Sequence, residues 1–254
     1  METPEFAARR VFGERAATYT TSSAHTDPHV LERVVALSHA QSNWTALDIA
    51  TGTGHTAFAV APHVARVAGV DLTPEMLIEA RRLSRRHGVT NVAFGLADAR
   101  WLPFLDQSFE LATCRRAAHH FSDLRRALRE MRRVLRPGGR LVVDDRSVPE
   151  DDFADALMNE LDRLHDESHV REYRPSEWTT YLEEAGFCVE MVDPYVKPRP
   201  LSSLTNGVSA EYVERMYGLL DVLNEAQRRT FNLDKRDGEL WCNHWFVMLA
   251  AVKM

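Results

Sequence analysis

The stretch that decides the fold runs from Leu47 to Asp71 and reads LDIATGTGHTAFAVAPHVARVAGVD. It predicts an apolar strand, a glycine-rich turn, a helix and a second strand that ends in a carboxylate. Gly52 and Gly54 allow the backbone to turn sharply and to approach a ligand that a Cβ atom would repel. The unpaired N–H groups of the following helix favour a carboxylate or a phosphate. Because Asp71 can accept hydrogen bonds from both hydroxyl groups of a ribose, the stretch predicts a nucleoside-cofactor site.

An alternative explanation of this stretch is an ordinary tight turn, with Asp71 serving only to cap the next helix. The order of the elements argues against it, because a GxG pair between an apolar strand and a helix, with an acid closing the next strand, is much more specific than the glycines alone. A nicotinamide dehydrogenase would have a third glycine where Ala57 stands, although alanine is tolerated there. The loop by itself therefore separates these two kinds of cofactor site only weakly.

Strands and helices alternate up to Asp145, which predicts βαβ units and a parallel sheet covered on both faces. Residues 12–25 are polar and turn-prone, and three prolines interrupt the pattern in residues 194–208. The expected strands are 44–50, 67–71, 92–96, 109–114, 141–144, 187–192 and 245–252, and the expected helices are 28–37, 56–64, 74–87, 123–135, 152–165, 176–185 and 210–231.

We expect the 254 residues to form a single domain, since a chain of this length with 44% hydrophobic residues can bury a substantial core. Residues 1–43 are expected to form an N-terminal lid and the first helix. Residues 44–149 are expected to form the cofactor-binding core, and residues 150–254 the cap helices and the last two strands.

The charge distribution argues against a nucleic-acid partner. The net charge is −6, and residues 150–254 hold 21 acidic side chains against 11 basic ones. The arginine clusters of the first half lie on expected helices, where a solvated outer face is the simpler explanation.

No apolar run approaches the ~20 residues that a membrane span requires, and the N-terminus has no uninterrupted apolar signal segment. We therefore expect a cytoplasmic protein without a membrane span. Cys114, Cys188 and Cys242 lie far apart and form no CxxC, so neither a disulfide framework nor a zinc site is indicated, and no metal is expected.

Four motifs give the chain a resemblance to a known family. They are LDIATGTGHTA, VAGVDLTPEML, ADARWLPFLDQSFEL and LREMRRVLRPGGRLVV, each lying around one of the first five strands. The chain resembles class I S-adenosylmethionine-dependent methyltransferases, in particular the branch similar to ubiquinone and menaquinone biosynthesis methyltransferases. The resemblance implies a Rossmann-like, doubly wound, seven-stranded sheet, mostly parallel with an antiparallel last strand between the fifth and sixth, plus helical cap elements.

The same resemblance implies S-adenosylmethionine as the cofactor and S-adenosylhomocysteine as the product. A carboxylate near adenine suits its exocyclic amine, which is a hydrogen-bond donor. The family usually has glycine where Ala50 stands. The implied assignments are Asp48, Ala50, Thr51, Gly52 and Gly54 to the methionine portion, Asp71 to the ribose, Leu72, Met76, Asp98 and Ala99 to adenine, the backbone carbonyl of Arg115 to the ammonium group, and Tyr19 to a lid over the cofactor.

Two histidines follow the fourth expected strand, at the sheet edge where ligands bind in such folds. His119 and His120 are therefore candidate bases for deprotonating the acceptor, since histidine titrates in the useful range, and His120 is also a candidate cofactor contact. Structural histidines that bond to the backbone are the alternative. A second group, made of His25, His165, His169 and Arg171, is expected to contact substrate.

We expect a methyltransferase for a small, apolar or aromatic acceptor, working by C- or O-methylation. An N- or S-methyltransferase of a small amine or thiol is one alternative. A non-catalytic protein that binds S-adenosylmethionine is another, although it would be expected to lose all candidate bases. A monomer and a homodimer are equally compatible with the sequence.

Overall fold

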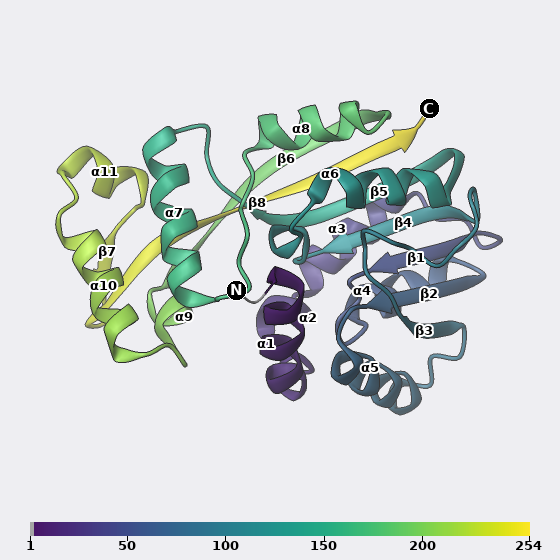
Figure 1. The fold of residues 1–254 in the computed structure, drawn as a ribbon, viewed down its shortest axis with the longest axis horizontal. Helices are drawn as coiled ribbons and strands as arrows, with labels where there is room; N and C mark the ends of the chain where they lie inside the picture. The colour runs from purple at the N-terminus through teal and green to yellow at the C-terminus, as the bar shows by residue number, and fades with distance from the viewer. Residues whose placement is uncertain (1–2) are drawn as a thin grey trace.

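A mixed sheet runs through residues 3–254, which are the residues that the computed structural model describes (Figure 1). Over this range it has eight strands in the order β3-β2-β1-β4-β5-β8-β6, and β7 pairs with β8 outside that path. The strands are β1 Thr45–Ile49, β2 Arg66–Asp71, β3 Val92–Leu96, β4 Phe109–Arg115, β5 Leu135–Ser147, β6 Phe187–Pro200, β7 Asp234–Arg236 and β8 Glu239–Lys253.

The first five strands are parallel, and β8 lies antiparallel between β5 and β6. Asp144 of β5 pairs with Met248 of β8, and Leu249 pairs with Val192 of β6. The predicted α/β class and the antiparallel insertion of the last strand are therefore confirmed. The parallel arrangement matters for function because the carboxyl ends of β1, β2 and β4 meet at one edge of the sheet.

Helices cover the two faces of the sheet. Alternating residues of β1 show the division, because Ala46 packs with residues of α3 and α4 while Leu47 packs with residues of α6 and α8. The helices are α1 Pro4–Tyr19, α2 Ser23–Thr26, α3 Pro28–Ser38, α4 His55–Val60, α5 Pro74–His87, α6 Leu124–Val134, α7 Asp152–His165, α8 Pro175–Glu184, α9 Ser202–Thr205, α10 Ala210–Asp221 and α11 Glu225–Thr230, with 3-10 turns at Ala61–His63 and Ala118–His120.

A second group of elements lies beyond the end of the sheet, at the left of Figure 1. It contains α7, α9, α10, α11 and β7, together with the outer parts of β6 and β8. Met158, Leu204, Met216 and Phe231 are buried in its own apolar core.

The polar segment 12–25 was expected to be turn-prone, and the structure corrects this, because most of it belongs to helix α1. Thr3 caps this helix by accepting a hydrogen bond from the Phe6 N–H, and Pro4 occupies its first turn. Its buried side chains are mostly alanines, with Val11 the largest. Such small residues give a faint apolar stripe, so the helical period was hard to detect in the sequence.

Strand β6 is also longer than expected, since it continues past Val192 to Pro200 through all three prolines. Its only strand partner among the described residues is β8, which makes it an edge strand. Proline is tolerated at an edge because the missing N–H would face outward. The first part of segment 194–208 is therefore strand up to Pro200, and the helix α9 follows it.

The expected helix 210–231 is broken at Val222, and α11 starts after Asn224, which caps it through a reciprocal pair of bonds with Gln227. The last strand begins at Glu239, six residues earlier than expected, and forms a hairpin with β7. The Asp237-Gly238 pair has positive φ at both residues and is the sequence signal for that hairpin. This hairpin gives the sheet its eighth strand, where seven were expected.

Within the described part of the chain, none of the helices combines the length and apolar character needed to cross a membrane.

Candidate active site

The loop between β1 and α4 has an unusual backbone. Gly52 and Gly54 have φ of 53° and 92°, and a Cβ on Gly54 would lie 2.8 Å from Cζ of Phe58. Ala50, at the start of the loop, also has a positive φ of 52°. An L-residue in this region costs roughly 1–2 kcal/mol, so the alanine that replaces the family's glycine is tolerated at some cost.

Asp71 anchors this loop from the end of β2. Its Oδ2 accepts a hydrogen bond from the Gly52 N–H at 2.8 Å, and its Oδ1 accepts one from the Thr73 N–H at 2.9 Å. The side chain is buried, and burial raises its pKa. Each carboxylate oxygen keeps a further lone pair, so the group can still accept hydrogen bonds from a ligand.

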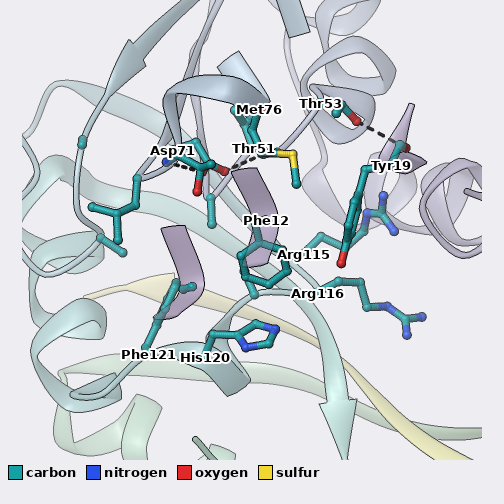
Figure 2. A pocket seen from close by; sticks show the side chains of 18 of the residues that line it. Phe12, Tyr19, Thr51, Thr53, Asp71, Met76, Arg115, Arg116, His120 and Phe121 are labelled. Atoms are coloured by element: carbon teal, nitrogen blue, oxygen red, sulfur yellow. Dashed lines mark hydrogen bonds between the residues drawn. The ribbon is translucent and has the colours of Figure 1, made fainter. Parts of the chain in front are cut away.

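A space that we call the loop cavity lies between this loop, the ends of β2, β3 and β4, and helix α1 (Figure 2). Its empty volume, counted together with the part that is open to solvent, is about 990 Å³. The residues from the sequence prediction that line it are Tyr19, His25, Ala50, Thr51, Gly52, Asp71, Leu72, Met76, Asp98, Ala99, Arg115 and His120.

Two of the expected cofactor contacts do not line the loop cavity. Gly54 lies at the N-terminus of α4, behind the loop. Asp48 is buried, and its carboxylate accepts hydrogen bonds from the hydroxyl groups of Thr51, at 2.6 Å, and Thr113, at 2.7 Å. Asp48 therefore fixes the loop to β4 from behind.

Helix α1 forms a wall of the loop cavity, with the Phe12 and Tyr19 rings turned inward (Figure 2). The carbonyl of Tyr19 lies 3.1 Å from Nε2 of His55, which is the first residue after the glycine loop. Burial raises the pKa of the Tyr19 phenol to about 12, so the side chain is neutral at physiological pH. The N-terminal helix thus borders the loop cavity.

A second tie between α1 and the core passes through Arg100. Its guanidinium binds Asp98 at 2.6 Å and Glu5 of α1 at 2.6 Å. Burial disfavours the ionised form of Asp98, but the hydrogen bonds and charge of Arg100 outweigh it and lower the pKa of this carboxyl. Asp98 is therefore a carboxylate already held by an arginine, a pairing that the sequence analysis missed.

Arg115 contributes its side chain as well as its backbone. Its Nε donates to Thr56 Oγ1 at 2.9 Å, and its Nη2 donates to the carbonyl of His25 at 2.6 Å. The third nitrogen, Nη1, is buried without a hydrogen-bond partner among residues 3–254. An unpaired buried donor of this kind destabilises the folded protein by about 1–3 kcal/mol. A ligand that accepts a hydrogen bond from Nη1 would remove this cost.

A second space adjoins the first and contains five histidines, and we call it the histidine cavity. It lies between α1, the β4 and β5 ends, α7 and the outer part of β6. Its histidines are His25, His119, His120, His165 and His169, and the five residues that border both cavities are Phe12, Tyr19, His25, Arg116 and His120.

His119 forms a buried pair with Asp145. Its Nδ1 lies 2.6 Å from Oδ1 of Asp145, and its backbone N–H donates to Oδ2 at 3.0 Å. Burial, with His120 and Arg146 nearby, lowers the pKa of His119 well below the usual value. The neutral ring then donates its Nδ1–H to Asp145 and keeps the Nε2 lone pair available to accept a proton.

The other histidines of this cavity bond differently. His120 has its Nδ1 3.1 Å from the carbonyl of Ser168, and its ring lies 4.0 Å from that of His119, centre to centre. His169 has Nε2 3.0 Å from Asn159 Oδ1, and His165 has Nδ1 2.7 Å from a backbone carbonyl. Among the histidines of this cavity and the partners described in residues 3–254, only His119 is paired with a carboxylate at hydrogen-bond distance.

The chain matches a family model described as "Methyltransferase domain" over residues 40–186. It is 42% identical over 222 residues to the uncharacterized methyltransferase YcgJ of Bacillus subtilis, covering 87% of this chain and 88% of that protein. The chain belongs to the methyltransferase family. The crystal structure of YcgJ superposes with a TM-score of 0.84 over 89% of this chain and 98% of that one.

More distant relatives extend the comparison. A demethylmenaquinone methyltransferase of Thermus thermophilus is 46% identical over 99 residues, which is 38% of this chain and 44% of that protein. The geranyl diphosphate C-methyltransferase of Streptomyces coelicolor shares the fold at 15% identity and a TM-score of 0.64, over 90% of this chain and 79% of that one. The chain is thus an S-adenosylmethionine-dependent methyltransferase.

Arg171 lines neither cavity, although the sequence analysis expected it to contact substrate. Its guanidinium binds Asp155 at 2.9 Å and Glu177 at 3.0 Å, which joins α7 to α8. The backbone of this segment is attached to the residue that precedes His120, because the N–H groups of Val170 and Arg171 both donate to the carbonyl of His119. The segment thus supports the histidine through its backbone.

Asp48 makes the stability of this methyltransferase depend on pH. Burial raises its pKa to about 6 from 3.8, so the folded state binds the proton more tightly than the unfolded state. The stabilisation that comes from this raised pKa is fully present below pH 4 and is lost as the pH rises through 6. The free energy of unfolding should therefore change by about 2–3 kcal/mol between these limits through Asp48 alone. Asp48→Asn should therefore destabilise the protein less at pH 7.5 than at pH 4.5.

Urea unfolding of both proteins at the two pH values measures this difference, because the contributions of all other titrating groups cancel between wild type and variant. A destabilisation that is equal at both pH values would contradict a raised pKa at Asp48.

Proposed function

We propose that the enzyme binds S-adenosylmethionine in the loop cavity and transfers its methyl group to a small acceptor in the histidine cavity. The observation that carries this proposal is the border between the two spaces, formed by the five residues that line both. A cofactor held on the glycine loop would direct its reactive end toward that border, at the carboxyl ends of the strands. Residues 1–43 and 150–254 would then serve as the lid and cap around a core of residues 44–149.

The residues present in the loop cavity fit this cofactor. Asp71 offers two carboxylate oxygens to the ribose hydroxyls. The unpaired Nη1 of Arg115 suits the carboxylate of the methionine portion, since a guanidinium and a carboxylate form strong charge-assisted hydrogen bonds. Met76 and Leu72 supply apolar contacts near Asp98, where we place the adenine.

The bound cofactor supplies an activated methyl group on a sulfonium, so the protein's tasks are positioning, exclusion of water and removal of a proton. We assign the proton to Nε2 of His119, because Asp145 holds the ring and stabilises the cation that forms. The acceptor atom, carbon or oxygen, loses that proton and gains the methyl group, while the bonding pair stays on sulfur. His120, which borders both cavities, would close the passage between them.

Calorimetric titration with S-adenosylmethionine, S-adenosylhomocysteine and NAD tests the cofactor assignment before any acceptor is known. We expect micromolar binding of the first two and none of NAD. A screen with methyl-labelled cofactor and small phenols, enols and amines then tests transfer. Binding of NAD alone would overturn the proposed site, and tight cofactor binding with no transfer to any acceptor class would favour a non-catalytic binding protein.

A further inference from the structure

We propose that the histidine cavity recognises an acceptor that carries an anionic group, a carboxylate or a phosphate, and that Arg199 is the residue that binds this group. The inference rests on the proposed function, because it assigns a substrate class to the same acceptor cavity.

Arg199 is the arginine of the outer β6 segment that lines the histidine cavity. Its side chain is half-buried and forms no ion pair or hydrogen bond with any residue from 3 to 254, although its backbone pairs with Cys242 of β8. Three other arginines line this cavity, and two of them are neutralised: Arg116 binds Asp144 at 2.9 Å and Arg146 binds Asp162 at 2.5 Å, whereas Arg15 of α1 is the third. A half-buried cation without a counter-ion is expensive, unless a ligand provides the opposite charge.

The surroundings of Arg199 add positive charge. Its guanidinium lies 5.5 Å from the centre of the Phe246 ring, and Arg116 lies over the same ring at 3.8 Å. Burial, with Arg116 and Arg146 close by, lowers the pKa of Arg199 to about 10, which still leaves it charged at pH 7. The negative charge of Asp27 favours the charged form of Arg199, but this carboxylate already forms an ion pair with Lys197.

The acidic residue Asp166 also lines this cavity, but it is held elsewhere. Its Oδ1 accepts hydrogen bonds from the N–H of Ser168 at 2.9 Å and from its hydroxyl at 2.6 Å. The charges that lower its pKa, against the effect of burial, include His120 and His165. Asp166 therefore lies on the histidine side of the cavity, and it forms no ion pair with Arg199 among the described residues.

A second donor faces the same cavity without a partner. The hydroxyl of Ser203, on α9 just after β6, is buried and makes no hydrogen bond within residues 3–254. Arg199 and Ser203 thus both bring hydrogen-bond donors to this cavity, and donors of this kind bind carboxylates and phosphates. Both residues lie outside residues 40–186, where the family model matches, so the shared cofactor chemistry does not account for them.

Ligand binding to the enzyme saturated with S-adenosylhomocysteine tests the inference. The probes are benzoate and phenyl phosphate as anions, and benzyl alcohol as a neutral aromatic of similar size. We expect the anions to bind and benzyl alcohol to bind at least about tenfold more weakly, since hydrogen bonds between charged groups are stronger than those between neutral groups. The stronger of benzoate and phenyl phosphate identifies the anionic group.

Arg199→Met keeps the length of the side chain and removes its charge, so it should weaken anion binding at least tenfold, whereas Arg199→Lys should retain part of it. The matched control is Arg229→Met, at an exposed arginine of α11. Because Arg199 has no ion pair to lose, Arg199→Met should unfold at an unchanged or higher temperature. A clear fall in unfolding temperature would instead indicate a structural role.

The outcomes separate this inference from the proposed function. If S-adenosylhomocysteine binds wild type and Arg199→Met equally but benzoate and phenyl phosphate bind no better than benzyl alcohol, the anionic acceptor is wrong and the cofactor site stands. Equal anion binding by wild type and Arg199→Met would also overturn the role of Arg199. If S-adenosylhomocysteine fails to bind the wild type, the proposed function itself fails.

Discussion

Replacement of Asp71 by alanine should weaken the binding of S-adenosylhomocysteine by about 100-fold or more. Two ribose hydroxyls would lose a charged acceptor, and each such hydrogen bond contributes about 1.5–3 kcal/mol. The variant also releases the N–H groups of Gly52 and Thr73, which Asp71 holds at 2.8 and 2.9 Å. The glycine loop would therefore lose part of its preorganisation, which adds to the loss of affinity.

Calorimetry at constant ionic strength measures this change. Asp71→Asn keeps one acceptor oxygen and should show an intermediate affinity. Asp221→Ala, at an exposed position on α10, is the control for removal of an acidic side chain far from the cavity. A dissociation constant for Asp71→Ala within threefold of the wild type, with an unchanged unfolding temperature, would show that Asp71 does not hold the ribose.

The glycine loop and Asp71 could be predicted because their signals are local. A sharp turn needs glycine, and an acid at the end of β2 lies beside the loop whatever the rest of the chain does. The parallel core followed from the alternation of strands and helices for the same reason. The inserted position of β8 followed only from the family resemblance, since β8 is remote in sequence from β5 and β6, between which it lies.

The parts of the site that were missed depend on contacts between distant segments. Arg100 meets Glu5 only because α1 docks against the core, and its faint apolar stripe gave no sign of that. Asp145 could have been found, because β4 and β5 are neighbouring parallel strands and their carboxyl ends place it beside His119. Arg199 could not, because its segment was interpreted as irregular and proved to be an edge strand.

The second large effect concerns the proposed base. His119→Ala should lower the rate of methyl transfer by about 10²–10⁴-fold, the usual contribution of a positioned base, and leave the affinity for S-adenosylhomocysteine within twofold of wild type. His63→Ala is the control, because this exposed histidine of the 3-10 turn Ala61–His63 lines neither cavity. His120→Ala should also slow transfer, but by less, since Ser168 and not a carboxylate orients its ring.

Single-turnover transfer of a labelled methyl group, with the acceptor found by the screen, measures these rates. Because burial lowers the pKa of His119 well below its usual value, the base stays neutral and the wild-type rate should be flat between pH 8 and 6.5. A wild-type rate for His119→Ala would remove this residue from the mechanism.

The role of Asp145 distinguishes a base from a histidine that merely fills space. If Asp145 acts through His119 by holding its Nδ1–H, Asp145→Asn should slow transfer, and the double variant His119→Ala/Asp145→Asn should be no slower than His119→Ala alone. If the two residues acted independently, their effects would multiply. Since Asp145 is fully buried, its own removal also costs stability, and the comparison is therefore made at a temperature where all three variants remain folded.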